Sequence, residues 1–221
     1  MHDSPVQLIQ LFTHPMLESL LLRAMPPDHE RAALTTKEKF LLLLVSSLLE
    51  NNSVIVEVGT YMGGSASILA KPNPTNRVFC FDVFDDEKAH KAHSEWTDKY
   101  LGTGVVRSIA NVRQLLRAFK NITLTQIKDR DSTVSNWSIP IDLYFEDGNH
   151  KDPTFTNNVK FWSSHLKVNG YMVLHDYRPD YEIGKGRHPD VDRVVEEFKN
   201  NDKWAFCGLV DSIALFQKLS N

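Results

Sequence analysis

The sequence has little cysteine and no excess of positive charge. Cys80 and Cys207 are the only cysteines in 221 residues, which is too few for a disulfide framework. Cys80 lies in an apolar run, where a reduced thiol behaves as a small hydrophobe. The net charge of -3, with lysine and arginine scattered along the chain, gives no reason to expect a nucleic-acid partner.

The chain also has no apolar stretch long enough for a membrane span. Its most apolar segment, Phe40–Leu49, is too short to cross a bilayer. Residues 1–15 lack the basic flank and the unbroken apolar core of a signal peptide. We therefore expect a reduced, cytoplasmic protein with no membrane partner. Its 42% hydrophobic and 24% charged residues are ordinary for a globular fold.

Repeats, low-complexity tracts and linkers are missing as well, and the length suits one domain rather than two. We expect a single domain over residues 1–221, with a helical N-terminal extension at 1–50 and an α/β core at 51–221. The apolar N-terminal helices either cover the core or form the interface of a homo-oligomer, and the sequence leaves this choice open.

Short apolar runs alternate with amphipathic segments along the core. A T-x-x-E capping box at Thr35 and Glu38 predicts that a helix begins just before the apolar run at 39–49. Strands alternating with helices predict an α/β, Rossmann-like doubly wound sheet that is mostly parallel. The last two strands are joined by too short a connection for a parallel crossover, so an antiparallel strand ends the sheet. The predicted strands are residues 53–60, 77–83, 122–128, 141–147, 170–176, 204–210 and 213–219, and the predicted helices of the core are 64–70, 105–119, 156–166 and 188–200.

A glycine-containing turn, EVGTYMGGS, follows the first predicted strand, at the kind of position where such sheets bind ligands. It differs from the G-x-G-x-x-G of a dinucleotide site because Tyr61 occupies the middle glycine position. Glu57 is unfavourable beside a pyrophosphate but suits a ligand with a positive amino or sulfonium group. Asp82 ends the second strand, where an acidic residue binds ribose hydroxyls. A tight turn without a ligand is the alternative; the combination favours S-adenosylmethionine.

Several segments of the chain resemble a known family. The segments IVEVGTYMGGSASILA, FCFDVFDD, LTQIKDRDS, EDGNHKD and GYMVLHDY are similar to the class I S-adenosylmethionine-dependent methyltransferases. Within these, they resemble the small-molecule O-methyltransferases that include the macrocin-type enzymes, and the resemblance covers residues 35 to 218. It implies a cofactor loop, a ribose-binding acid at Asp82, and an adenine pocket near Asp131 and Ser132. The predicted loop residues are Glu57, Gly59, Thr60, Tyr61, Gly63 and Ser65.

Polar clusters end two further predicted strands, EDGNHKD at 146–152 and LHDY at 174–177. Asp147 and Asp176 are a natural carboxylate pair for Mg²⁺ or another divalent cation, with His175 as a further ligand. A cation lowers the pKa of an acceptor hydroxyl, and His150, assisted by Asp147, is the candidate general base.

Other interpretations of these clusters stay open. In these alternatives Asp147 simply begins a turn, His150 lies on the surface, and His175 orients Asp176 without a metal. Catechol O-methyltransferases have Asp-Asn where this chain has Asp176-Tyr177, so the family comparison removes one expected ligand.

We therefore predict an S-adenosylmethionine-dependent O-methyltransferase that acts on a hydroxyl of a small molecule, such as a sugar or a polyphenol. A metal-independent O- or N-methyltransferase and a non-catalytic cofactor-binding module are the alternatives. The polar segment at 85–104 is a candidate lid, and its His90 and His93 fit a solvated helix face better than a metal site. The loop at 177–188 is a second candidate for acceptor selection.

Overall fold

The computed structural model describes residues 15–84, 98–99, 101, 105, 107–128, 131–183 and 185–221. The candidate lid at 85–104, with His90 and His93, therefore lies almost wholly outside the described residues. Among the helices that are described, none is both long and apolar enough to cross a membrane.

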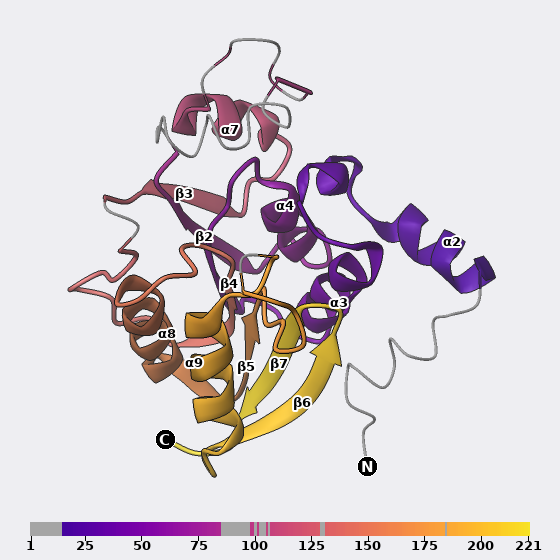
Figure 1. The fold of residues 1–221 in the computed structure, drawn as a ribbon. Coiled ribbons are helices and arrows are strands. Elements are labelled where there is room, and N and C mark those ends of the chain that lie inside the picture. Colours follow the sequence, from indigo (N-terminus) through magenta and orange to yellow (C-terminus); the bar gives the residue numbers. More distant parts are fainter. Residues whose placement is uncertain are drawn as a thin grey trace.

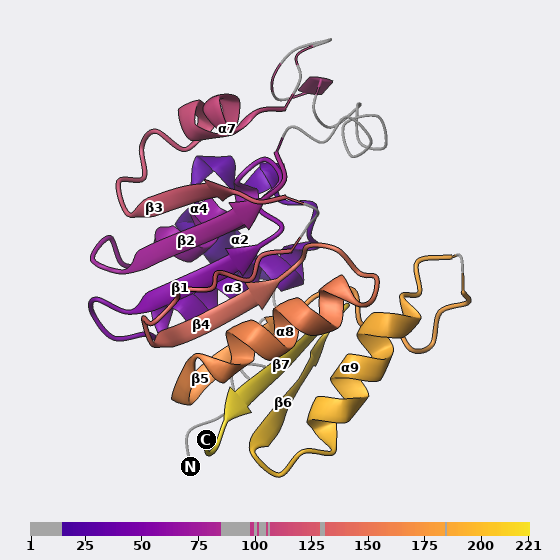
Figure 2. The same ribbon diagram turned by 90° about the vertical axis from the view of Figure 1, so that its left-hand side faces the viewer.

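The described residues form one seven-stranded sheet in the order β3-β2-β1-β4-β5-β7-β6, which Figure 2 shows from β3 at the top to β6 at the bottom. Neighbours from β3 to β5 run parallel, whereas β7 is antiparallel to both β5 and β6. The predicted Rossmann-like sheet with antiparallel C-terminal strands is confirmed. The strands are β1 (Val54–Val58), β2 (Arg77–Asp82), β3 (Ile122–Gln126), β4 (Ile141–Glu146), β5 (Leu166–Leu174), β6 (Trp204–Val210) and β7 (Ile213–Lys218).

Helices cover both faces of the sheet (Figures 1 and 2). On one face lie α3 and α4, and on the other lie α8 and α9. The helical elements are α2 (Pro15–Ala24), the 3-10 helix η1 (Pro27–Arg31), α3 (Thr36–Ser47), α4 (Gly64–Ala70), α7 (Ile109–Leu115), α8 (Thr154–Ser164) and α9 (Pro189–Lys199).

Strand alternation divides the core into two layers. On β4, Leu143 and Phe145 belong to the cluster shared with α3 and α4, whereas Tyr144 belongs to the cluster that contains Trp162 of α8. All four side chains are fully buried. Since both faces are covered, the inner strands are apolar on both sides, which explains their continuous apolar runs in the sequence.

Two predicted helices differ in their bounds from the observed ones by more than one residue at each end. The helix predicted at 105–119 is shorter, because α7 begins after Ser108, whose side chain accepts a hydrogen bond from the backbone N of Asn111. The helix predicted at 156–166 begins earlier and ends sooner as α8, and Leu166 already belongs to β5.

The strand order reverses between β1 and β4, which brings their carboxyl ends side by side. Val58 pairs with Glu146, and Glu146 pairs with Leu174 of β5. The residues that follow these strands therefore reach the same edge of the sheet at the same level. In such sheets this reversal point is where ligands bind.

Candidate active site

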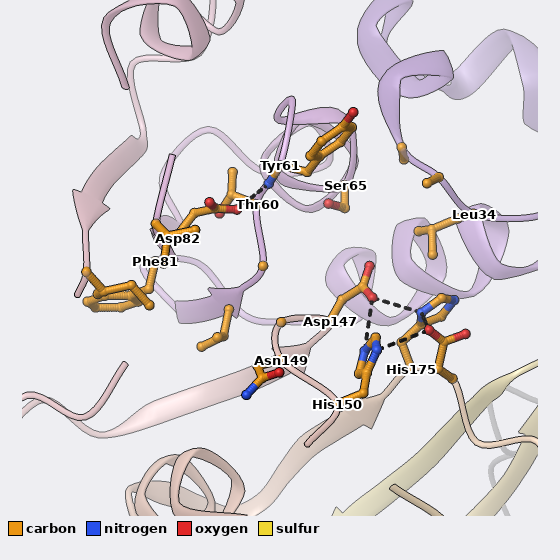
Figure 3. Close-up of a pocket in the computed structure, with 18 of the residues that line it drawn as sticks. Leu34, Thr60, Tyr61, Ser65, Phe81, Asp82, Asp147, Asn149, His150 and His175 are labelled. Carbon is orange, nitrogen blue, oxygen red and sulfur yellow. Dashed lines mark hydrogen bonds and ion pairs between the residues drawn. The ribbon is translucent and has the colours of Figure 1, made fainter. Parts of the chain in front are cut away.

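A cavity of about 580 Å³ lies at the carboxyl ends of β1, β2, β4 and β5. It extends from the glycine turn after β1 to the polar side chains that follow β4 and β5 (Figure 3). Segments far apart in the sequence therefore face one cavity. The sequence-predicted site residues that line it are Gly59, Thr60, Tyr61, Ser65, Asp82, Asp147, His150, His175 and Asp176.

The glycine turn allows a very close approach between the loops that follow β1 and β4. Gly59 has a φ of 90°, and a Cβ atom there would lie 2.1 Å from the backbone oxygen of Asp147. Only glycine fits this position. Gly63, with a φ of 78°, is the N-cap of α4 and does not line the cavity. The backbone at Gly59 therefore shapes the wall of the cavity, whereas Gly63 supports the turn from a position outside the cavity lining.

Asp82 fixes the opposite wall of the cavity. Its Oδ2 accepts a hydrogen bond from the backbone N of Tyr61 at 2.7 Å, and its Oδ1 accepts from the backbone N of Phe84 at 2.8 Å. Nη1 of Arg107, which is buried, also donates to Oδ1 at 2.9 Å. The predicted ribose acid is thus present at the cavity and already carries three hydrogen bonds.

Glu57 lies beneath the turn and does not line the cavity. Its side chain is fully buried, and neither carboxylate oxygen has a hydrogen-bond partner within the described part of the chain. Burial raises its pKa to about 7, against the opposing effect of the nearby Ser65, Cys80 and Thr60 side chains. A buried carboxyl without a partner is unfavourable when charged.

Asp131 and Ser132, predicted near the adenine, do not line the cavity. Oδ1 of Asp131 accepts hydrogen bonds from the backbone and hydroxyl of Thr133 on the surface. Ser132 is fully buried, and its hydroxyl oxygen accepts a hydrogen bond from Nε1 of Trp162 at 2.8 Å. These contacts organise the loop after β3 and pack it on α8.

Asp147, His150 and His175 meet at the other end of the cavity (Figure 3), and Asp176 completes this cluster. One potential ligand atom from each of Asp147, His150, His175 and Asp176 lies within 4.8 Å of all the others. Nδ1 of His175 is 2.8 Å from Oδ1 of Asp147, and Nδ1 of His150 is 3.4 Å from Oδ2 of Asp176. The two polar strand ends thus form a single cluster.

Both ring nitrogens of His175 face carboxylates. Nε2 is 3.6 Å from Oε1 of Glu38, an ion-pair distance longer than a hydrogen bond, while Nδ1 contacts Asp147. Burial lowers the pKa of His175, but the charge and hydrogen bond of Asp147 outweigh it and raise that pKa well above its usual value. Burial raises the pKa of Glu38, yet His175, Ser212 and Thr35 together bring it down to about 2.

His150 has the opposite balance. Burial lowers its pKa below the usual 6.5, although the charges of Asp147 and Asp176 oppose the shift. A neutral imidazole with a free electron pair is the form that accepts a proton. Of the two histidines in the cluster, His150 is the one suited to act as a base.

A comparison with known families decides the assignment. A family described as "Methyltransferase domain" matches residues 56–177, which include the glycine turn, Asp82 and both polar strand ends. The chain belongs to this methyltransferase family. The predicted resemblance to class I S-adenosylmethionine-dependent methyltransferases is confirmed, and the protein is an enzyme of that kind.

Solved structures share the fold of this methyltransferase. The O-methyltransferase TomG from Streptomyces achromogenes, involved in tomaymycin synthesis and solved with S-adenosylmethionine, has a TM-score of 0.59 at 16% identity, covering 90% of this chain and 89% of its own. The O-methyltransferase NovP has a TM-score of 0.60 at 13% identity, with 86% and 83% covered. A methyltransferase from Podospora anserina, bound to S-adenosylhomocysteine, has a TM-score of 0.57 at 14% identity, with 100% and 89% covered.

Two further residues join the methyltransferase site from the loop at 177–188. Nη2 of Arg178 forms an ion pair with Oδ1 of Asp176 at 2.8 Å. His188 lines the cavity; its Nε2 is 3.8 Å from Oδ2 of Asp176, and its ring centroid is 4.7 Å from that of His150. The length of this loop was the sequence signal for function, but it indicated no particular residue.

Proposed function

We propose that this methyltransferase transfers a methyl group from S-adenosylmethionine to a hydroxyl of a small molecule such as a sugar or a polyphenol. The observation that carries the proposal is the continuity of one cavity, which joins the glycine turn and Asp82 at one end to His150 and the two aspartates at the other. S-adenosylmethionine bound over the turn would direct its sulfonium group toward His150, the candidate general base.

In this proposal the cofactor lies along the turn, with Gly59, Thr60, Tyr61 and Ser65 beside it and Asp82 at its ribose. Val83 and Ile127 provide apolar lining next to Asp82, where the adenine ring of the cofactor would lie. We assign Glu57 and Gly63 to support of the turn. We assign no cofactor contact to Asp131 and Ser132, because Asp131 accepts hydrogen bonds from Thr133 within the loop after β3 and Ser132 accepts one from Trp162 of α8.

The proposed reaction forms a bond between the acceptor oxygen and the methyl carbon while the carbon–sulfur bond breaks. The electron pair of the broken bond stays on sulfur, and the hydroxyl proton passes to the imidazole of His150. General-base assistance of this kind contributes about 10²- to 10⁴-fold in rate. The burial that keeps His150 neutral prepares it for this role.

A divalent cation fits the same cluster. Asp147 and Asp176 present carboxylate oxygens, the ligands that Mg²⁺ prefers, at the edge of the cavity. The third predicted ligand, His175, directs both ring nitrogens at carboxylates, so we assign the cation to the two aspartates. When bound, the cation would lower the pKa of the acceptor hydroxyl.

One observation favours a metal-independent methyltransferase as a second candidate. Arg178 already provides a positive charge 2.8 Å from Asp176, which partly compensates the carboxylate pair without any ion. In that case His150 would act alone as the base.

Calorimetry and turnover assays test the proposal. Titration with S-adenosylhomocysteine should show one binding site, and a panel of sugars and polyphenols should contain an acceptor that gains one methyl group on oxygen. Adding EDTA and then restoring Mg²⁺ separates the two candidates, because only the metal-assisted one loses and regains activity. Failure to bind the nucleoside, or transfer to RNA instead of any small hydroxylated molecule, would contradict the proposed function.

A further inference from the structure

Glu38 is buried more deeply than a helix-capping residue requires. Its Oε2 accepts a hydrogen bond from the backbone N of Thr35 at 2.8 Å, which completes the capping box of α3. This bond needs only one oxygen, and a glutamine side chain serves equally well in such a box. The Glu38 side chain is nevertheless only 2% exposed, so its second oxygen has a separate explanation.

The second oxygen of Glu38 faces the active site from behind. Oε1 accepts hydrogen bonds from the backbone N and the hydroxyl of Ser212, at 2.9 and 2.6 Å, in the turn between β6 and β7. The same atom lies 3.6 Å from Nε2 of His175, and no hydrogen-bond partner satisfies Nε2 within the described residues. The imidazole of His175 is therefore held between Glu38 on one side and Asp147 on the other.

In this arrangement the buried imidazole of His175 fixes the side chain of Asp147, which faces the cavity. Nδ1 of His175 is 2.8 Å from Oδ1 of Asp147, whose side chain lines the cavity. His175 itself is only 5% exposed, so its ring has little room to turn. The ion-pair contact of Glu38 with Nε2 and the hydrogen bond of Asp147 with Nδ1 together set the direction of the imidazole, and the imidazole in turn orients the aspartate, as hydrogen-bonded partners do for carboxylates that bind metals.

We propose that Glu38 is a positioning residue for methyl transfer, which aligns the carboxylate of Asp147 with the reacting groups by holding His175 from the N-terminal helix α3. This inference rests on the proposed function, since it assigns Asp147 to the transfer step. Three separate segments, α3, the end of β5 and the β6–β7 turn, contribute to the contact.

Glu38→Gln tests the proposal with Thr35→Ala as its matched control. Glu38→Gln keeps a side-chain oxygen for the backbone N of Thr35, whereas Thr35→Ala removes the hydroxyl that caps the backbone N of Glu38 and leaves the carboxylate of Glu38 in place. We expect Glu38→Gln to lower kcat about tenfold, within the range of losses for supporting residues of a site. The KM for S-adenosylmethionine should change less than about twofold, because the nucleoside end of the cavity is untouched, and Thr35→Ala should keep both values near wild type.

A second measurement does not depend on turnover. In ¹⁵N-labelled protein, the imidazole resonances of His175 should shift in Glu38→Gln and stay in place in Thr35→Ala. If the wild-type enzyme transfers no methyl group to any acceptor, the proposed function fails, while the imidazole spectrum still reports whether Glu38 holds His175.

Ser212→Ala covers the case in which Glu38→Gln does not fold. It removes one donor from Oε1 of Glu38 and should give a smaller loss of kcat with a shift of the His175 resonances. Unchanged kcat and an unchanged imidazole spectrum in the variant that folds would overturn the proposal. An equal loss of kcat in Thr35→Ala would overturn it too, because the effect would then belong to the helix cap.

Discussion

Arg107 and Asp82 form a buried ion pair, with Nη1 of the arginine 2.9 Å from Oδ1 of the aspartate, at the wall of the cavity. The guanidinium carbon of Arg107 also lies 5.1 Å from the centre of the Tyr61 ring. Because Oδ1 already accepts two hydrogen bonds and Oδ2 one, the carboxylate has room for about one further donor. A ribose hydroxyl would donate this further hydrogen bond to Oδ2, which accepts only the one from Tyr61.

Asp82→Asn should therefore weaken binding of S-adenosylhomocysteine by at least about tenfold, since a hydrogen bond to a charged group contributes about 1.5–3 kcal/mol. Asp131→Asn is the control: its side chain is exposed and outside the cavity lining, so its affinity should equal that of the wild type. Calorimetry on variants shown to be folded by circular dichroism makes the comparison. Equal losses in both variants would place the nucleoside elsewhere.

The carboxylate pair gives a second prediction. Asp147→Asn and Asp176→Asn should each lower kcat by about 100-fold or more, the upper end of what loss of a supporting residue costs a metal site. Asp152→Asn, an exposed carboxylate a few residues farther along the same loop, should stay within about twofold of wild type. Steady-state rates with Mg²⁺ and with EDTA provide the measurement; full activity of either cluster variant in EDTA would remove the cation from the mechanism.

The rate should depend on pH through His150. Burial lowers the pKa of this imidazole below 6.5, and the base must be neutral, so kcat should fall as the pH drops through that lowered value and level off above it. His150→Gln should lose about 10²- to 10⁴-fold in kcat together with this acidic limb. His165→Gln, on the far end of α8, should keep both. A midpoint well above 6.5 would contradict the assignment.

Stability should depend on pH through Glu57. Its pKa is about 7 in the folded protein and near 4.5 when the chain is unfolded, so the folded state binds the proton more tightly. The contribution of Glu57 to the free energy of unfolding should then decrease as the pH rises from about 4.5 to 7, by about 3 kcal/mol. Burial also raises the pKa of Glu146, to about 8, so Glu57→Gln should keep the decrease due to Glu146 and lack only the part due to Glu57. Urea denaturation at several pH values in this range compares the two proteins, and identical pH profiles would show that Glu57 is not the group responsible.

The sequence predicted the sheet and much of the cavity for a physical reason. Apolar runs and the residues that end them are local patterns, and parallel strands bring their carboxyl ends to one edge. Gly59, Asp147 and Asp176 follow three different strands, Asp82 ends a fourth, and all four residues line the same cavity. The experiments above test the roles predicted for these residues and the small-molecule acceptor, while the cytoplasmic location and the oligomeric state stay predictions.

What the sequence did not predict depends on contacts between distant segments. Arg107 reaches Asp82 across 25 positions and Glu38 reaches Ser212 across 174, and no local spacing indicates either pair. Glu38 was predicted from its capping box alone, which left its second oxygen without a role. Asp131 and Ser132 follow the expected strand, but the loop turns their polar atoms toward Thr133 and Trp162 instead of the cavity.

The contact between Glu38 and Ser212 has a consequence for the order in which the enzyme matures. A chain leaving the ribosome contains Glu38, Asp147 and His175 long before Ser212 is added. The hydroxyl and amide that hold Oε1 of Glu38 arrive only with the β6–β7 hairpin. A nascent chain that ends before that turn would lack both donors, so His175 should be held in its final position only after the β6–β7 turn has been synthesised.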